Sequence, residues 1–303
     1  MSIASKLACS SMIVCCLMAC DQRARLPVNA LVPSHAIAML ELRWQEARSD
    51  RVLTQFTALP RPATVIHGLG VTLDAAETVI AFSTSLDGSD GGDTLIVSSR
   101  DVVSRFIAAA SGRWIESSTG SAAVYDDPAS RYRALIVSDS VLAIGPRQSI
   151  ERVAATAGLK ASPFLARSEL TDLAEMFESP EPVRMAVVWP MEVRDATNAL
   201  VAGSAGLLKL GGLSALGGVV EKFGIGRAVA MSCSRNVNDV RCRLAGVMQD
   251  ESTASIVAGG LSLLKGLAGL VPQPRAHERP SVSMADLTVD RRGTTVTVGV
   301  SLR

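Results

Sequence analysis

Residues 226–248 read GRAVAMSCSRNVNDVRCRLAGVM, with a β-like run on each side of the polar segment NVND (236–239). Two short runs separated by Asn and Asp are typical of a β-hairpin. A turn centred between Val237 and Asn238 places Cys233 directly opposite Cys242. The segment therefore predicts two antiparallel strands, 226–234 and 239–248, joined by a tight turn.

The opposed cysteines suggest a covalent link across this hairpin. Cross-strand Cβ atoms at a non-hydrogen-bonded pair lie close enough for a disulfide. We therefore predict a Cys233–Cys242 disulfide, with two free buried thiols as the alternative. The spacing fits neither a CxxC redox pair nor a zinc site.

Beyond this hairpin, the same order of expected elements occurs twice along the chain. Both halves run strand, helix, hairpin, helix, hairpin, with one additional strand in the first half. In the first half the expected strands are 36–42, 77–85, 93–99, 121–127, 133–139 and 140–145, with helices at 43–58, 101–110 and after 145. In the second half the expected strands are 183–189, 226–234, 239–248, 282–290 and 294–302, with helices at 192–222 and 251–270.

This order predicts an α+β protein made of tandem ferredoxin-like (split βαβ) repeats, with antiparallel sheets and helices on one face. Glycine and proline interrupt the pattern at 156–164, so the predicted modules are 34–160 and 161–303. The alternative is one α+β domain with accidental symmetry.

The N-terminus carries a separate signal. Lys6 precedes an uncharged run, LACSSMIVCCLM (7–18), which has the length of a signal-peptide core and is too short to span a bilayer. Ala19 and Cys20 follow, so that LMAC (17–20) resembles the lipobox of bacterial lipoproteins. The resemblance implies a signal peptide over 1–19, a lipidated Cys20 and a tether over 20–33. The alternatives are a secretory signal cut elsewhere and a cytoplasmic chain with an apolar start.

The same resemblance implies a place in the cell. We expect a body held at the envelope, facing the periplasm, with the membrane as its first partner through the lipid. Asp21 resembles the residue that retains lipoproteins in the inner membrane of enteric bacteria, although an outer-membrane position stays open. Of the six cysteines, export and lipidation leave Cys233 and Cys242, an even pair in an oxidising compartment.

Charge argues against nucleic acid as a partner. Removal of Lys6 leaves 29 basic and 29 acidic residues, and no basic surface is evident. The hydrophobic content of 48% is ample for a core, and the low aromatic content of 4% means that Ala, Val, Leu and Ile must fill it.

Two apolar, glycine-rich stretches stand out, 202–218 and 258–270. They are interpreted as helices buried in the fold, as a surface that contacts the bilayer or holds an apolar ligand, or as a true span, which Lys209 opposes. The possible apolar surface comprises Leu207, Leu208, Leu210, Leu213, Leu263, Leu264 and Leu267.

Signals for catalysis are weak. His35, His67 and His277 lack metal-ligand spacing, and Ser262–Lys265 matches S-x-x-K without the other motifs of penicillin-binding proteins. We therefore predict no catalytic residue, metal or cofactor. The expected function is non-enzymatic, of a binding or structural type, with a protein partner, a lipid or the envelope wall as the bound species. The hairpin edges of such a sheet can accept an extra strand from a protein partner. The alternatives are a carrier of a lipid or hydrophobic ligand, and an envelope enzyme that uses carboxylates such as Asp74, Glu77, Asp126 and Asp127.

Overall fold

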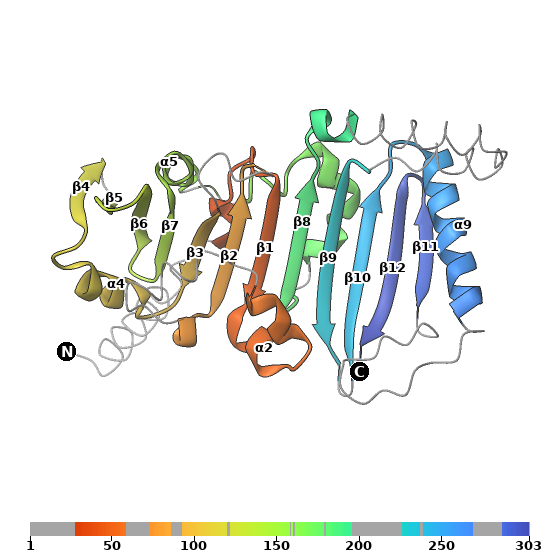
Figure 1. Cartoon of the computed structure of the whole chain (residues 1–303), viewed down its shortest axis with the longest axis horizontal. Coiled ribbons are helices and arrows are strands. Elements are labelled where there is room, and N and C mark those ends of the chain that lie inside the picture. Colours follow the sequence, from red (N-terminus) through yellow and green to blue (C-terminus); the bar gives the residue numbers. More distant parts are fainter. Residues whose placement is uncertain are drawn as a thin grey trace, which may run out of the picture.

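A single twelve-stranded antiparallel sheet runs through the part of the molecule that the structure describes (Figure 1). The computed structural model describes residues 28–58, 73–85, 93–119, 122–157, 159, 161–178, 180–195, 226–236, 239–268 and 287–302. The strands are β1 Ala38–Arg43, β2 Thr78–Ser83, β3 Thr94–Ser98, β4 Ile115–Thr119, β5 Ala122–Asp126, β6 Tyr132–Ser138, β7 Val141–Pro146, β8 Val183–Val188, β9 Ala228–Arg235, β10 Val240–Val247, β11 Thr288–Arg292 and β12 Thr295–Leu302.

Short helices connect these strands. The α-helices are α2 Trp44–Ser49, α4 Val102–Ala110, α5 Arg147–Thr156, α6 Glu175–Glu178 and α9 Glu251–Ala268. The 3₁₀ helices are η1 Val28–Leu31, η2 Leu53–Ala58, η3 Leu73–Ala75 and η4 Ser168–Leu173. The helix expected over 43–58 is thus divided at residues 50–52, where the Asp50 carboxylate accepts hydrogen bonds from the backbone N–H groups of Val52 and Leu53. Of the expected helix 192–222, residues 196–222 lie outside the described residues.

The strand order repeats on the two sides of the central β1–β8 pair. One side reads β1-β2-β3-β7-β6 and continues to β5 and β4, while the other reads β8-β9-β10-β12-β11. The two sides therefore share one connectivity, with the β4–β5 hairpin as an addition to the first.

The expected α+β class with antiparallel strands is confirmed, but the ferredoxin-like form is not. In a ferredoxin-like unit, the two strands joined by a helix run parallel and are separated by a third strand. Here β1 and β2, which α2 joins in sequence, are direct antiparallel neighbours. All eleven strand pairs in the described part of the chain are antiparallel. Nor are there two sheets, because β1 and β8 pair in register from Ala38↔Val187 to Leu42↔Val183 and join the halves.

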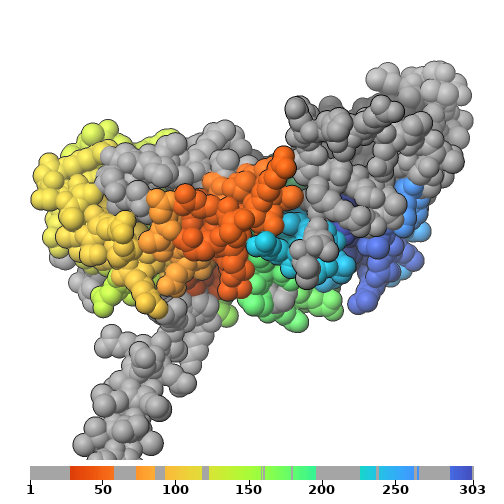
Figure 2. Space-filling view, turned by 90° about the horizontal axis from the view of Figure 1, so that it is seen from below, coloured from red at the N-terminus to blue at the C-terminus, as the bar shows by residue number. Residues whose placement is uncertain are grey.

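The expectation of helices on one face is wrong, because both faces carry helices. We call the side that presents Leu40 and Leu42 the first face, and the side that presents Met39 and Glu41 the second face. The core on the first face includes residues of α2 and α4, and the core on the second face includes residues of η1, α5, η4 and α6. Seen along the sheet, the orange part with α2 and the green part with α6 lie on opposite sides (Figure 2).

The physical reason lies in the central strands. All six residues of β7 are buried, and so are the first four of β3. A strand covered on both sides reads as a continuous apolar run rather than an alternating one. The runs TLIV and VLAIG are of this kind, and each needs a helical layer on both sides.

Candidate functional site

The C-terminal part of the sheet carries a polar groove on its second face, which we call the β12 groove. Strand β12 forms its floor with side chains that are short: Thr295, Thr297, Gly299 and Ser301. Its neighbours β10 and β11 supply longer side chains at the same level, with Arg243 opposite Gly299 on one side and Asp290 opposite Thr297 on the other. The short residues of β12 beside these longer side chains leave a trough along the strand.

The alternation of β12 explains why this face is polar. Its sequence, TVTVGVSL, places the valines on the first face, where Val296 is buried and Val300 packs against the core. The intervening Thr, Gly and Ser residues then fall on the second face, because side chains alternate along a strand. A half-covered strand results, unlike β3 and β7.

One cavity, of about 520 Å³, occupies the end of the groove near Ser301. Arg241, Arg243 and Lys265 bring positive charge to it, and Glu181 brings one negative charge. Hydroxyl groups complete the polar lining, from Ser232, Ser234, Thr288 and Ser301. The volume is in the usual range for small-molecule sites.

A second cavity, of about 440 Å³, occupies the other end near Thr295. Arg243 lines it as well, so the two cavities adjoin at this residue. Here acidic side chains dominate, with Arg292 within 3.5 Å of Asp290 as the second cation. The acidic lining residues are Asp172, Glu175, Glu251 and Asp290. The two ends of the groove therefore carry opposite net charge.

The predicted disulfide is confirmed beside this groove. Cys233 and Cys242 are direct cross-strand partners in the β9–β10 register, with Cα atoms 4.1 Å apart, and their sulfurs are bonded. Both side chains belong to the buried core of the first face. The bond fixes β9 to β10 directly behind the arginines that line the groove.

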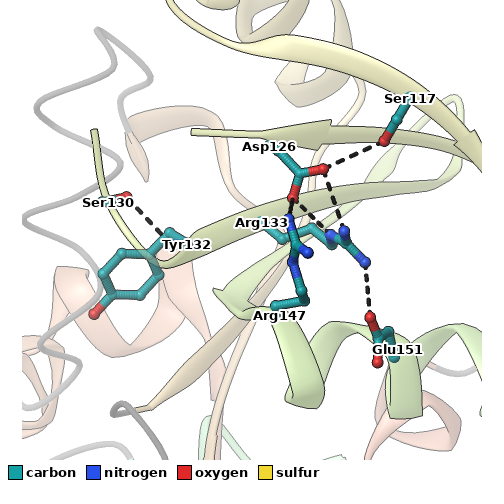
Figure 3. A network of polar contacts seen from close by, with 7 residues as sticks. All are labelled: Ser117, Asp126, Ser130, Tyr132, Arg133, Arg147 and Glu151. Carbon is teal, nitrogen blue, oxygen red and sulfur yellow. Dashed lines mark hydrogen bonds and ion pairs between the residues drawn. The ribbon is translucent and has the colours of Figure 1, made fainter. Parts of the chain in front are cut away.

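A second polar cluster lies in the N-terminal half (Figure 3). The Asp126 carboxylate accepts hydrogen bonds from Arg133 at 2.8 and 3.2 Å and from Arg147 at 3.2 Å. Arg133 also donates to Glu151 on α5 at 3.0 Å. The Arg133 hydrogen bond is the main reason that the pKa of Asp126 lies below its ordinary value, despite opposing desolvation. The cluster ties β5 and β6 to α5 and is balanced in charge.

The carboxylate of the neighbouring Asp127 contacts a different set of partners. Burial raises its pKa, but hydrogen bonds from the Ser130 hydroxyl and the Ala129 N–H, together with Arg113 at 3.3 Å, lower the pKa overall. Asp126 and Asp127 are therefore both held as anions by separate arginines. They do not form a shared acid–base pair.

The remaining carboxylates of the enzyme alternative are also paired. Asp74 forms an ion pair with Arg48, and Glu77 lies 3.8 Å from Arg100. A general acid at neutral pH needs a raised pKa. Among the described carboxylates, every resolved pKa shift is downward, for Asp101, Asp126, Asp127 and Glu169.

The residues of the expected apolar surface lie wholly or partly outside the described part of the chain. Leu207, Leu208, Leu210 and Leu213 lie outside the described residues, as do Cys20 and Asp21. Leu263, Leu264 and Leu267 fall on α9, but their side chains are likewise outside the description. A mainly apolar cavity of about 190 Å³, lined by described residues, lies around Met39, Phe82 and Met185. The carrier alternative stays a prediction.

Metal and membrane signals can be searched only where the chain is described. No group of three or more His, Cys, Asp or Glu side chains in that part is arranged to hold a metal ion. No helix in that part combines the length and apolarity needed to cross a membrane.

Sequence reasoning missed the β12 groove, although its signal was present. The Thr-Gly-Ser alternation of 295–301 marks one polar face of the last strand, and Arg241 and Arg243 mark the same face of β10. Although α9 and β11 separate β10 from β12 in the sequence, the two strands pair in the sheet, and this pairing places the two polar patterns side by side.

Fold and site together define an α+β protein with one antiparallel sheet between helices and an open polar groove at its C-terminal end. No family model matches the chain, and no curated protein matches it. Solved structures of TP0453 are similar to it. Crystal form I has a TM-score of 0.49 at 10% identity, covering 93% of this chain and 94% of that one. Crystal form III has a TM-score of 0.46 at 11% identity, with coverages of 90% and 92%. Crystal form IV has a TM-score of 0.46 at 10% identity, with coverages of 93% and 94%.

Proposed function

We propose that this chain is an exported bacterial lipoprotein, cleaved before Cys20, anchored there by lipid and facing the periplasm. The observation that carries this proposal is the Cys233–Cys242 disulfide, because such bonds form and persist in oxidising compartments and are rare in the cytosol. It supports the lipobox-like LMAC segment from a part of the chain that is unrelated to it.

Anchoring at Cys20 limits how far the folded part of the chain can lie from the membrane. Eight residue steps separate Cys20 from Val28, where η1 begins. At full extension they reach roughly 30 Å. The sheet is thereby kept near the membrane surface, and two or three acyl chains hold it stably.

We further propose that the protein acts by binding rather than by catalysis, with the β12 groove as its binding surface. Two adjoining cavities on one polar face support this role. The carboxylates considered for an enzyme are instead engaged with arginines.

We also infer that the two halves are a diverged tandem repeat. The support is the shared connectivity on the two sides of β1–β8. The repeated unit then consists of one strand, a first hairpin, a helix and a second hairpin, and all its neighbouring strands are antiparallel. The C-terminal half contains the β12 groove, and in the N-terminal half α5 covers the corresponding surface.

The anchor is tested by fractionation of the native host and by the mass of the mature N-terminal peptide. We expect that peptide to begin at Cys20 and to carry diacylglycerol, and we expect Cys20→Ala to leave the membrane fraction. Cys16→Ala is the matched control, since Cys16 is removed with the signal peptide. A mature peptide that begins elsewhere without lipid would refute the anchor.

The sorting role of Asp21 is tested in the same host. Asp21→Ser should move the lipidated protein from the inner to the outer membrane, with the mass of the N-terminal peptide changed only by the substitution. An unchanged distribution between the two membranes would remove the role of Asp21 while leaving the anchor intact.

A further inference from the structure

The β12 groove lies where the first half of the molecule places a helix. Strands β6 and β7 correspond to β11 and β12 in the repeated order, and on their second face Ile150 and Val153 of α5 pack against Leu135 and Ala143. On β12 the same face presents Thr295, Thr297, Gly299 and Ser301 instead. An apolar helix does not suit this row of β12, because none of its four residues has a large apolar side chain.

The dimensions of the groove restrict what fits. Ser301 and Thr295 are six residues apart on one strand, which corresponds to roughly 20 Å. An extended peptide of about six residues has that length. Hydroxyl groups along the floor and walls can accept from a peptide N–H and donate to a peptide C=O.

The charges restrict the ligand further. The Ser301 end is lined by Arg241, Arg243 and Lys265, and the Thr295 end by Asp172, Glu175 and Asp290. A ligand with a carboxylate at one end and an ammonium group at the other complements both. A compact zwitterion, such as a lipid headgroup, does not reach from one end to the other.

We propose that the β12 groove binds a short, extended peptide with free termini, its carboxylate at Arg241 and Arg243 and its amino group at Asp172 and Glu175. This deepens the proposed binding function and rests on it. Arg243 lines both cavities, so it is placed to contact the peptide near its middle and at its carboxylate end.

The test uses the full-length chain as the Cys20→Ala variant, immobilised and exposed to a defined pool of randomised synthetic hexapeptides. Three forms of the pool are compared: free termini, C-terminally amidated, and N-terminally acetylated. We expect the free form to be retained, and each blocked form to be retained about tenfold less, because each loses one charge-assisted contact.

Two substitutions assign the ends of the groove. Arg243→Gln should reduce retention of the free pool about tenfold and remove the preference over the amidated pool. Glu175→Gln should remove the preference over the acetylated pool. The matched control is Arg100→Gln, an exposed arginine in the other half, whose side chain is 86% accessible, and it should retain the free pool like the parent chain.

Three results would overturn the proposal: equal retention of free and blocked pools, unchanged retention by Arg243→Gln, or retention of phosphatidylethanolamine vesicles but of no peptide. Circular dichroism of each variant establishes that it is folded. If Cys20 is lipidated in the host but no peptide pool is retained, the peptide inference fails while the envelope assignment stands.

Discussion

Arginine–carboxylate contacts are the recurrent polar feature at the residue scale. Asp126 with Arg133, Asp127 with Arg113 and Glu169 with Arg167 each combine an ion pair with hydrogen bonds. In all three carboxylates the pKa lies below its ordinary value. These anions stabilise the folded state, and their protonation at low pH should weaken it.

Glu169 gives the clearest test of this effect. Its carboxylate accepts from Arg167 at 2.7 Å, the main reason that its pKa falls to about 2 from 4.5. Because the folded pKa is the lower one, the stabilisation is complete above about pH 4.5 and is lost as the pH falls toward 2. Glu169→Gln should therefore lower Tm at pH 7 and have no effect on Tm at pH 2.

The measurement is thermal unfolding followed by circular dichroism between pH 7 and pH 2. Glu192→Gln, at an exposed position, is the control and should leave Tm within about a degree of the parent, as surface substitutions usually do. A Tm difference for Glu169→Gln that stays the same across this pH range would contradict the assignment.

At the scale of single elements, the β9–β10 hairpin combines a hydrogen-bonded ladder with a covalent link. Its two cysteines are nine residues apart in sequence. Closing a loop of that size lowers the entropy of the unfolded chain, which stabilises the folded state by about 2–3 kcal/mol. The hairpin should therefore depend measurably on the bond.

Cys233→Ala/Cys242→Ala should lower the free energy of unfolding by about 2–3 kcal/mol in urea titrations. A thiol reductant should destabilise the parent chain by a similar amount and leave the variant unchanged. If the reductant affects both proteins equally, its effect does not come from this disulfide.

The β3–β7 pair shows how one glycine permits close packing between strands. A Cβ at Gly145 would lie 2.4 Å from Thr94 Oγ1 and 2.9 Å from Thr94 Cβ, and Thr94 is fully buried. Neither strand can move without disturbing the core on both faces. Gly145 is thus needed for space rather than for an unusual backbone angle.

Gly145→Ala should destabilise the protein by about 1–3 kcal/mol, the usual cost of overpacking. Thr94→Gly in the same chain removes the atoms in the way, so the double variant should lose less than the sum of the single losses. Chemical denaturation of the four proteins checks this. Additive losses would mean that the two residues do not compete for space.

For the whole molecule, the decisive contact is the β1–β8 pair that joins the two halves. Glu41 and Arg184 are direct cross-strand partners there, form an ion pair, and are each less than 10% exposed. Arg184 also donates to the Phe177 carbonyl at 2.8 Å. A buried ion pair at this position fixes which residues of the two halves face each other.

Removing one partner should be costly, because it leaves a buried charge without compensation. We expect Glu41→Leu and Arg184→Met each to lower the free energy of unfolding by about 3–5 kcal/mol. The double variant Glu41→Leu/Arg184→Met should recover most of this loss. Urea denaturation gives the double-mutant cycle, and a double variant as unstable as the sum of the singles would argue against a coupled pair.

Much of the local structure could be predicted from the amino-acid sequence alone. Alternation and turn residues predicted the β9–β10 hairpin and the opposed cysteines. The repeated order of elements was also visible. Strand β4 was missed, because its sequence IESST has no apolar alternation.

How these elements join depends on long-range strand pairing, which local patterns do not predict. The pairing of β1 with β8 connects Glu41 to Arg184 across more than 140 positions, and it turns two expected sheets into one. The helical layers on both faces and the β12 groove follow from which strands become neighbours. A local pattern predicts the two faces of one strand, whereas the groove depends on side chains from several strands and helices that long-range pairing brings together.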